Sequence, residues 1–205
     1  MWTPGMLRAG LIMAALGLAA DPPARADEVI EQIDVGKSYY AEGDLSQALS
    51  EFEFAVNTLR TRISSAFMAT LPEAPVLWTA GKPTLDNGAA LLGTGVMVTR
   101  RYEEDKGEGR ITAELLADSP MVQAFSAVLN SPVMIASDPA LERIRLGRTS
   151  ALLKWDAAGR AGELSVSLGG RVLVKLTGQD LDDKTTLVEL METWDLEAVK
   201  EVAGL

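Results

Sequence analysis

Two neighbouring segments near the start of the chain carry apolar residues at helical spacing. Residues 28–42 and 44–70 predict two helices separated at Gly43. In the second segment the apolar residues recur at intervals of three and four, the repeat of one helix face. These residues are Leu45, Leu49, Phe52, Val56, Leu59 and Ile63. Asp44 precedes them and is suited to cap the second helix, because its carboxylate can accept a hydrogen bond from a free backbone N–H. The pattern predicts a helical hairpin over residues 27–71.

From residue 95 onward, apolar and polar residues alternate, which is typical of half-buried β-strands. The predicted strands are 95–103, 110–117, 141–147, 149–156, 162–168 and 170–177. The predicted helices of this region are 120–130, 183–193 and 195–203. This order predicts an α+β fold in which an antiparallel sheet, within a domain of residues 95–205, has helices on one face. Residues 72–94 contain several Pro and Gly, and we expect them to be a linker.

The alternation sorts the last four strands into two faces. The apolar face, directed at the helices, is expected to hold Ile144, Leu146, Leu164, Val166, Leu168, Val172, Val174 and Leu176. The other face is expected to hold Arg143, Arg145, Ser165, Ser167, Arg171 and Lys175, with Leu173 as an apolar exception and Glu163 as its only acid. We also expect Phe125, on the mid-chain helix, and Trp155 to be buried against each other's layer.

This basic face has three interpretations. It is a solvated surface with partial ion pairing, or the acidic helical hairpin lies across it. In the third, Arg143, Arg145, Arg171 and Lys175 form a face for an anionic ligand or an acidic partner, because they are basic side chains on an acidic protein.

The first 26 residues have the layout of a secretory signal peptide. Arg8 supplies a positive charge, an apolar run extends from Ala9 to Ala20, and the segment ends in Ala24-Arg25-Ala26, a small-x-small cleavage site. The run is about a dozen residues, shorter than the roughly 20 needed to span a bilayer. We expect cleavage after Ala26 and a periplasmic protein that is not bound to the membrane; the alternative is an uncut membrane anchor.

Composition restricts the chemistry. The chain has 205 residues, no Cys, no His and a net charge of −10. Catalysis by a Ser-His-Asp triad or a Cys-His pair and a His-based metal site are therefore excluded. Acidic side chains cluster at 103–105 and 180–183, in predicted turns where they are solvated or cap a helix. An acidic protein repels nucleic acid. We expect no catalytic residue, metal or cofactor, and no nucleic-acid partner.

Residues 32–65 resemble a single tetratricopeptide repeat. Val35, Gly36, Tyr39, Ala48 and Phe52 fall in the register of that family's pattern, and Ala55 occupies its next small position. The sequence departs from the pattern at Gln32, where the family has Trp, and lacks a closing Pro near Arg60. The resemblance implies a helical hairpin and contacts with other proteins. The remainder is similar in element order to PsbP-like α+β proteins.

The small residues have a physical role in such a hairpin. Gly36 and Ala48 let the helices approach, while Tyr39 and Phe52 fill the space between them. One repeat cannot bury its own apolar face. The hairpin therefore packs on the rest of the chain, on another protein or on a second copy of itself. The sequence favours an exported, non-catalytic interaction or accessory protein. The alternative is a small-molecule carrier with an anionic or apolar ligand on the sheet face or between sheet and helices.

Overall fold

The computed structural model describes residues 27–85, 95–129, 131, 135 and 140–205. The predicted signal peptide therefore lies outside the described residues. Contacts divide the chain into two compact units, Met1–Ala55 and Val56–Leu205, and the division falls inside one continuous helix. The sequence placed the end of the hairpin at residue 71. The C-terminal half of the second helix instead belongs to the second unit, because Phe67 and Leu71 are buried in the core of that unit.

In the first unit, α1 (Glu28–Glu42) is followed by the start of α2 (Leu45–Thr70). Local hydrogen bonds set the ends of both helices. The Asp27 carboxylate accepts from the Val29 N–H at 3.0 Å, and the Asp44 carboxylate accepts from the Gln47 N–H at 3.0 Å. Between them, Gly43 has a φ of 83°, which only glycine adopts without strain, and this ends α1. The two helices and the Asp44 cap are as predicted.

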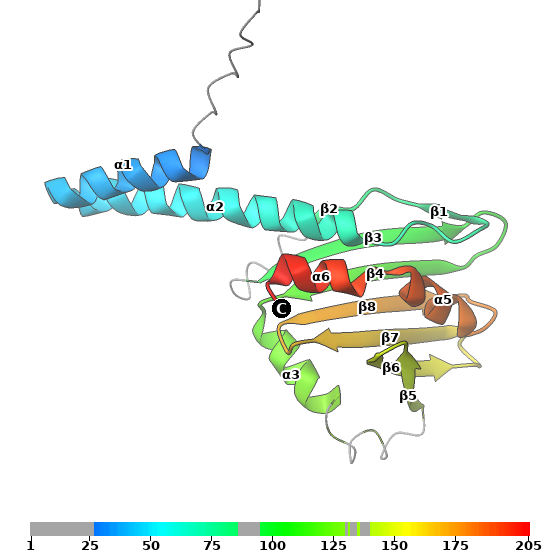
Figure 1. Ribbon diagram of the computed structural model, residues 1–205. Coiled ribbons are helices and arrows are strands. Elements are labelled where there is room, and N and C mark those ends of the chain that lie inside the picture. Colours follow the sequence, from blue (N-terminus) through cyan, green and yellow to red (C-terminus); the bar gives the residue numbers. More distant parts are fainter. Residues whose placement is uncertain (1–26, 86–94, 130, 132–134, 136–139) are drawn as a thin grey trace, which may run out of the picture. The chain divides into compact units, whose positions relative to one another are not determined.

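The second unit is built on an antiparallel sheet, which has eight strands in the described part of the chain (Figure 1). The strands are β1 (Trp78–Ala80), β2 (Thr84–Leu85), β3 (Val96–Glu104), β4 (Arg110–Ala117), β5 (Leu141–Leu146), β6 (Thr149–Asp156), β7 (Ala161–Leu168) and β8 (Val172–Gln179). Their order is β1-β3-β4-β8-β7-β6-β5, with β2 also beside β3. The predicted α+β class is confirmed. The linker prediction is wrong in part, because β1 and β2 lie within it and pair with β3.

One face of this sheet forms the main core with α5 (Thr185–Thr193) and α6 (Leu196–Ala203). The sheet contributes the alternating apolar residues that the sequence assigned to this face, including Leu164, Val174 and Leu176. The helices contribute Leu187, Leu190 and Val199, which are buried in the same cluster. The β7–β8 turn is Gly169-Gly170, and both residues have positive φ, as a two-residue hairpin requires.

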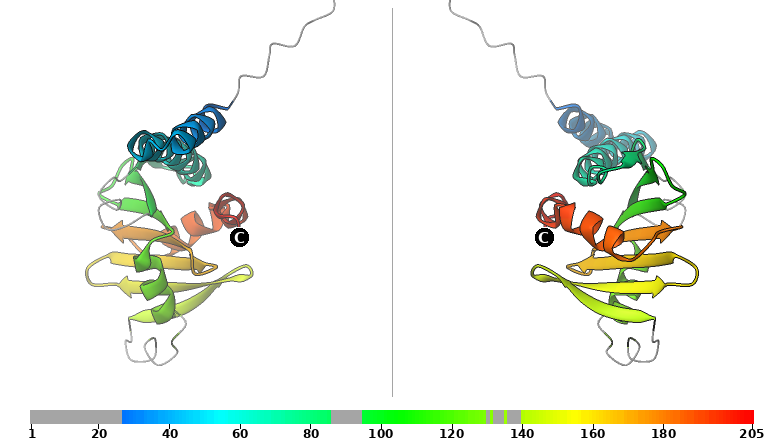
Figure 2. Two further views of the ribbon diagram at one scale, coloured as in Figure 1. Left: turned by 90° about the vertical axis from the view of Figure 1, so that its left-hand side faces the viewer. Right: turned by 90° about the vertical axis from the view of Figure 1, so that its right-hand side faces the viewer.

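The helix α3 (Pro120–Leu129) packs on the opposite face, so the helices do not all share one face (Figure 2). Val122 and Phe125 contact Leu116 and Leu173 there in a second, smaller cluster. Leu173, the apolar exception on β8, is thus part of the surface that α3 contacts. The prediction that Phe125 and Trp155 are buried against each other's layer is wrong for Trp155: Phe125 does pack on the sheet, but the half-buried Trp155 packs against the main core on the other face. Within the described residues, no helix has the length and apolar character to cross a membrane.

Candidate functional site

The basic face of the sheet is less basic in the structure than in the sequence. The register places Glu114 of β4 directly opposite Lys175 of β8. Their side chains form an ion pair and are only 20% and 28% exposed. The expectation that Glu163 is the only acid on this face is therefore wrong. The error arose because β4, more than 50 residues earlier in the chain, is the neighbour of β8.

Arg171 is also held by an acid of its own unit. Its guanidinium donates to both carboxylate oxygens of Asp118, at 2.9 and 3.1 Å, and to the backbone oxygen of Ala203 at 3.1 Å. The hydrogen bonds that Arg171 donates to Asp118, and the negative charge of that carboxylate, raise the pKa of Arg171. This side chain thus links the residue before β8 to the segment between β4 and α3 and to the end of α6. Its contacts are those of a structural residue.

The four basic residues therefore separate into two pairs. Lys175 and Arg171 are engaged with Glu114 and Asp118. Arg143 and Arg145 lie on β5, the edge strand of the sheet, and both are exposed. The structure does not bring the four together as one surface.

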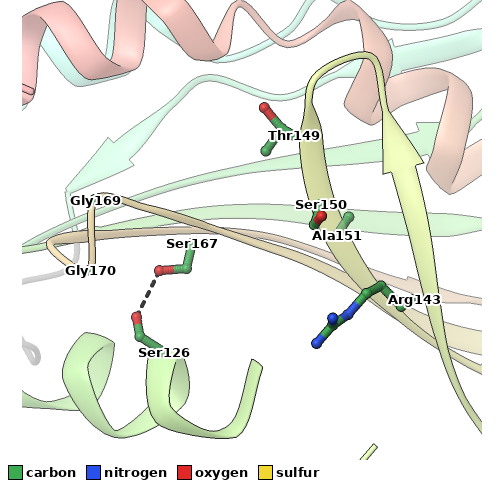
Figure 3. A pocket seen from close by; sticks show the side chains of 8 residues that line it. All are labelled: Ser126, Arg143, Thr149, Ser150, Ala151, Ser167, Gly169 and Gly170. Atoms are coloured by element: carbon green, nitrogen blue, oxygen red, sulfur yellow. Dashed lines mark hydrogen bonds between the residues drawn. The ribbon is translucent and has the colours of Figure 1, made fainter. Parts of the chain in front are cut away.

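A polar pocket of about 350 Å³ lies where β6 and β7 separate (Figure 3). The two strands are paired only from Asp156 opposite Ala161 to Leu152 opposite Ser165. Beyond that point β6 stays with β5, and β7 stays with β8. No sequence pattern marks this pocket, because the strands keep their alternation of apolar and polar residues where they diverge.

The lining of this pocket is hydroxylic and basic. Ser126 of α3 and Ser167 of β7 share a hydrogen bond of 2.7 Å, and the Arg143 side chain extends toward the same space (Figure 3). Ser150 adds another hydroxyl. A guanidinium with hydroxyl groups can bind a carboxylate or a phosphate. A serine hydroxyl acts as a nucleophile only beside a general base, and the described lining residues include none.

The hairpin places its small residues where the helices meet. Gly36 lies against Phe52, and a Cβ built at Gly36 would be 2.7 Å from the Cε1 atom of that ring. Ala48 and Ala55 are only 2% and 3% exposed, whereas Tyr39 is half-buried. Ala48 and Ala55 are seven residues apart and therefore lie on one side of α2.

Next to that side, α2 carries an apolar stripe that its own hairpin leaves largely uncovered. We call Leu45, Leu49, Phe52, Val56, Leu59 and Ile63 the α2 stripe. Leu45 and Leu49 are 63% and 58% exposed, and Val56, Leu59 and Ile63 are each 42% exposed. Apolar residues this exposed, in a continuous row on one helix, are typical of a contact surface.

The acidic clusters near residues 103–105 and 180–183 are the remaining candidates for a site. No group of three or more acidic side chains there is arranged to hold a metal ion. The acids near residues 103–105 and 180–183 instead bond to their surroundings: Asp180 pairs with Arg110, and Asp182 pairs with Arg160, both at 2.8 Å. Comparisons of this chain with protein-family models, with curated proteins and with solved structures find no match.

Proposed function

We propose that this protein is an exported, non-catalytic interaction or accessory protein, and that a helix of a protein partner docks on the α2 stripe. The observation that carries the proposal is the exposure of the stripe, between 42% and 63% for five of its six residues. The resemblance of residues 32–65 to a tetratricopeptide repeat supports it, because a lone repeat leaves an apolar face open.

The spacing of the stripe favours a helix as the occupant. Leu45, Phe52 and Leu59 are seven residues apart, and so are Leu49, Val56 and Ile63. Two interleaved series of this kind form the seam of a coiled coil, in which each apolar side chain inserts between residues of a facing helix. Burying the exposed part of five such side chains gives roughly 5 kcal/mol, at about 1 kcal/mol each. That gain must exceed the entropy lost on association.

Site-specific photo-cross-linking in the producing cell tests this proposal. A photoreactive amino acid is placed at Leu49 or Val56, in the stripe, and at Gln47, an exposed residue of the same helix about 160° away from the stripe. We expect a defined covalent adduct from Leu49 and Val56 and none from Gln47. Absence of adducts at the stripe, or equal adducts at all three positions, would refute the proposal.

A second candidate function is binding of a small anion in the pocket between β6 and β7. The observation in its favour is the convergence of Arg143 with the Ser126–Ser167 hydroxyl pair at the strand divergence. Native mass spectrometry of freshly purified protein would detect a bound small mass. We expect Arg143→Gln to remove that mass and Arg145→Gln, on the same strand, to retain it. Unliganded wild-type protein, or equal effects of the two substitutions, would count against a carrier.

A further inference from the structure

We infer that the helix docking on the α2 stripe is α2 of a second copy of this chain, running antiparallel. The inference rests on the proposed function and names its partner. It follows from the register of the stripe, from the flank of the stripe that the hairpin leaves open, and from the two charges on that flank.

The two heptad series of the α2 stripe set the register of the pair. In an antiparallel pair, residues of one heptad series face residues of the other series. Val56 then lies opposite Leu59 of the second copy, and Phe52 lies opposite Ile63 of the second copy. The same register places Leu49 opposite Ala66 of the second copy. Each contact occurs twice by symmetry, so the exposed side chains from Leu49 to Ile63 are all covered by one repeated arrangement.

The helical hairpin covers one flank of the α2 stripe and leaves the other flank open. Ala48 and Ala55 occupy the heptad position on one side of the stripe, and they are already buried, at 2% and 3% exposure. On the other side, Phe67 occupies the corresponding position near the end of α2 and is buried in the core of the second unit, but Glu53 and Arg60, seven residues apart at the same position, are both exposed. In the described part of the chain, neither has an ion-pair partner.

These two charges are complementary only in the antiparallel arrangement. At the register above, Glu53 lies at the height of residue 62 of the second copy. Arg60 of the second copy is two residues away along the axis, about 3 Å. The symmetric contact pairs Arg60 with Glu53 of the second copy. In a parallel pair the flank of Glu53 and Arg60 would instead face the flank that holds Ala48 and Ala55, which is already buried, so neither charge would meet a charge of opposite sign.

The charge along α2 favours the same direction. Its N-terminal half and the preceding turn carry Glu42, Asp44, Glu51 and Glu53, whereas the following turns carry Arg60 and Arg62. At the register above, an antiparallel pair brings Glu51 and Glu53 of each helix to the height of the basic turns of the other. A parallel pair would bring two acidic ends together on a chain of net charge −10.

Sedimentation equilibrium of the purified protein, with and without charge exchange, tests the inference. We expect wild-type protein to dimerise with concentration and Glu53→Arg or Arg60→Glu alone to weaken the dimer about tenfold, because each replaces two attractions with two repulsions. The double variant Glu53→Arg/Arg60→Glu restores the attraction and is expected to return to within about threefold of wild type. Ser50→Arg, exposed and away from the stripe, is the matched control and is expected to change nothing.

The outcomes separate this inference from the proposed function. Protein that stays monomeric up to about 1 mM, the weak limit of specific binding, overturns the second copy as partner. A stripe-specific photo-adduct with a different protein would still support the proposed function. A dimer that both single substitutions weaken, and that the double substitution fails to restore, overturns the antiparallel pairing.

Discussion

The contact between Gly36 and Phe52 predicts a substitution whose effect changes sign with its neighbour. A Cβ at position 36 would lie 2.7 Å from Cε1 and 2.9 Å from Cδ1 of the ring. Carbon atoms normally pack at about 3.5–4.0 Å, so the ring or the helices must move. Overpacking of this kind costs about 1–3 kcal/mol. Alanine is about 1 kcal/mol better than glycine inside a helix. We therefore expect Gly36→Ala to destabilise the hairpin by about 0–2 kcal/mol.

Removing the ring removes the clash. In a Phe52→Ala background, Gly36→Ala retains only its helix propensity and is expected to stabilise the hairpin by about 1 kcal/mol. Hydrogen exchange of α1 amides, measured by mass spectrometry on dilute protein, reports this local stability. Ser38→Ala, on the exposed side of α1, is the control for a change of composition alone. If Gly36→Ala stabilises α1 equally in both backgrounds, the two helices do not approach at this point.

Three further predictions concern other parts of the chain. Intact mass of the exported protein is expected to give an N-terminus at Asp27; a product retaining residues 1–26 would refute the signal peptide. Phe125→Ala is expected to lower the free energy of unfolding, measured by chemical denaturation, by about 1–2 kcal/mol. This is below the roughly 3–5 kcal/mol of a fully buried aromatic, because Phe125 is half-buried against Leu116 and Leu173. A loss above about 3 kcal/mol would contradict that placement. Burial raises the pKa of Tyr102, whose hydroxyl donates to the Pro72 oxygen at 2.6 Å, to about 12. Because the unfolded chain loses that proton near pH 10, the free energy of unfolding is expected to fall between about pH 10 and 12. The Tyr102→Phe variant is expected to show a smaller fall over that range, and equal slopes in both proteins would refute this cause.

Local patterns were sufficient for most of the fold. The period of three and four residues in 45–63 predicted α2, and the period of two predicted β3 to β8, because each pattern follows from one element having one buried side. The strands β1 and β2 were missed because they are only three and two residues long, in a segment broken by Pro and Gly. Such strands depend on pairing with β3 rather than on a pattern of their own.

The candidate site was less predictable because its parts are distant in sequence. The alternation placed Lys175 and Arg171 on one strand; β8 holds Lys175 and begins just after Arg171, and their partners Glu114 and Asp118 come from β4 and the residues after it. Pairing across so large a separation depends on strand order, which no local pattern encodes. Leu173 was noted as an exception in the sequence, yet only the packing of α3 explains it. The α2 stripe, in contrast, was visible as a periodic pattern, and the structure added its exposure.

Disulfide trapping tests the antiparallel pairing of α2 most directly, because the chain contains no cysteine of its own. Leu49→Cys and Ala66→Cys are purified separately, mixed and oxidised. The antiparallel register places these two positions opposite each other across the pair, whereas two copies of either one are 17 residues apart, about 25 Å along the axis. It predicts a disulfide-linked dimer in the mixture and little in either variant alone, since a disulfide needs Cα atoms within about 7 Å. A dimer formed by Leu49→Cys alone, or no dimer in the mixture, would contradict the account.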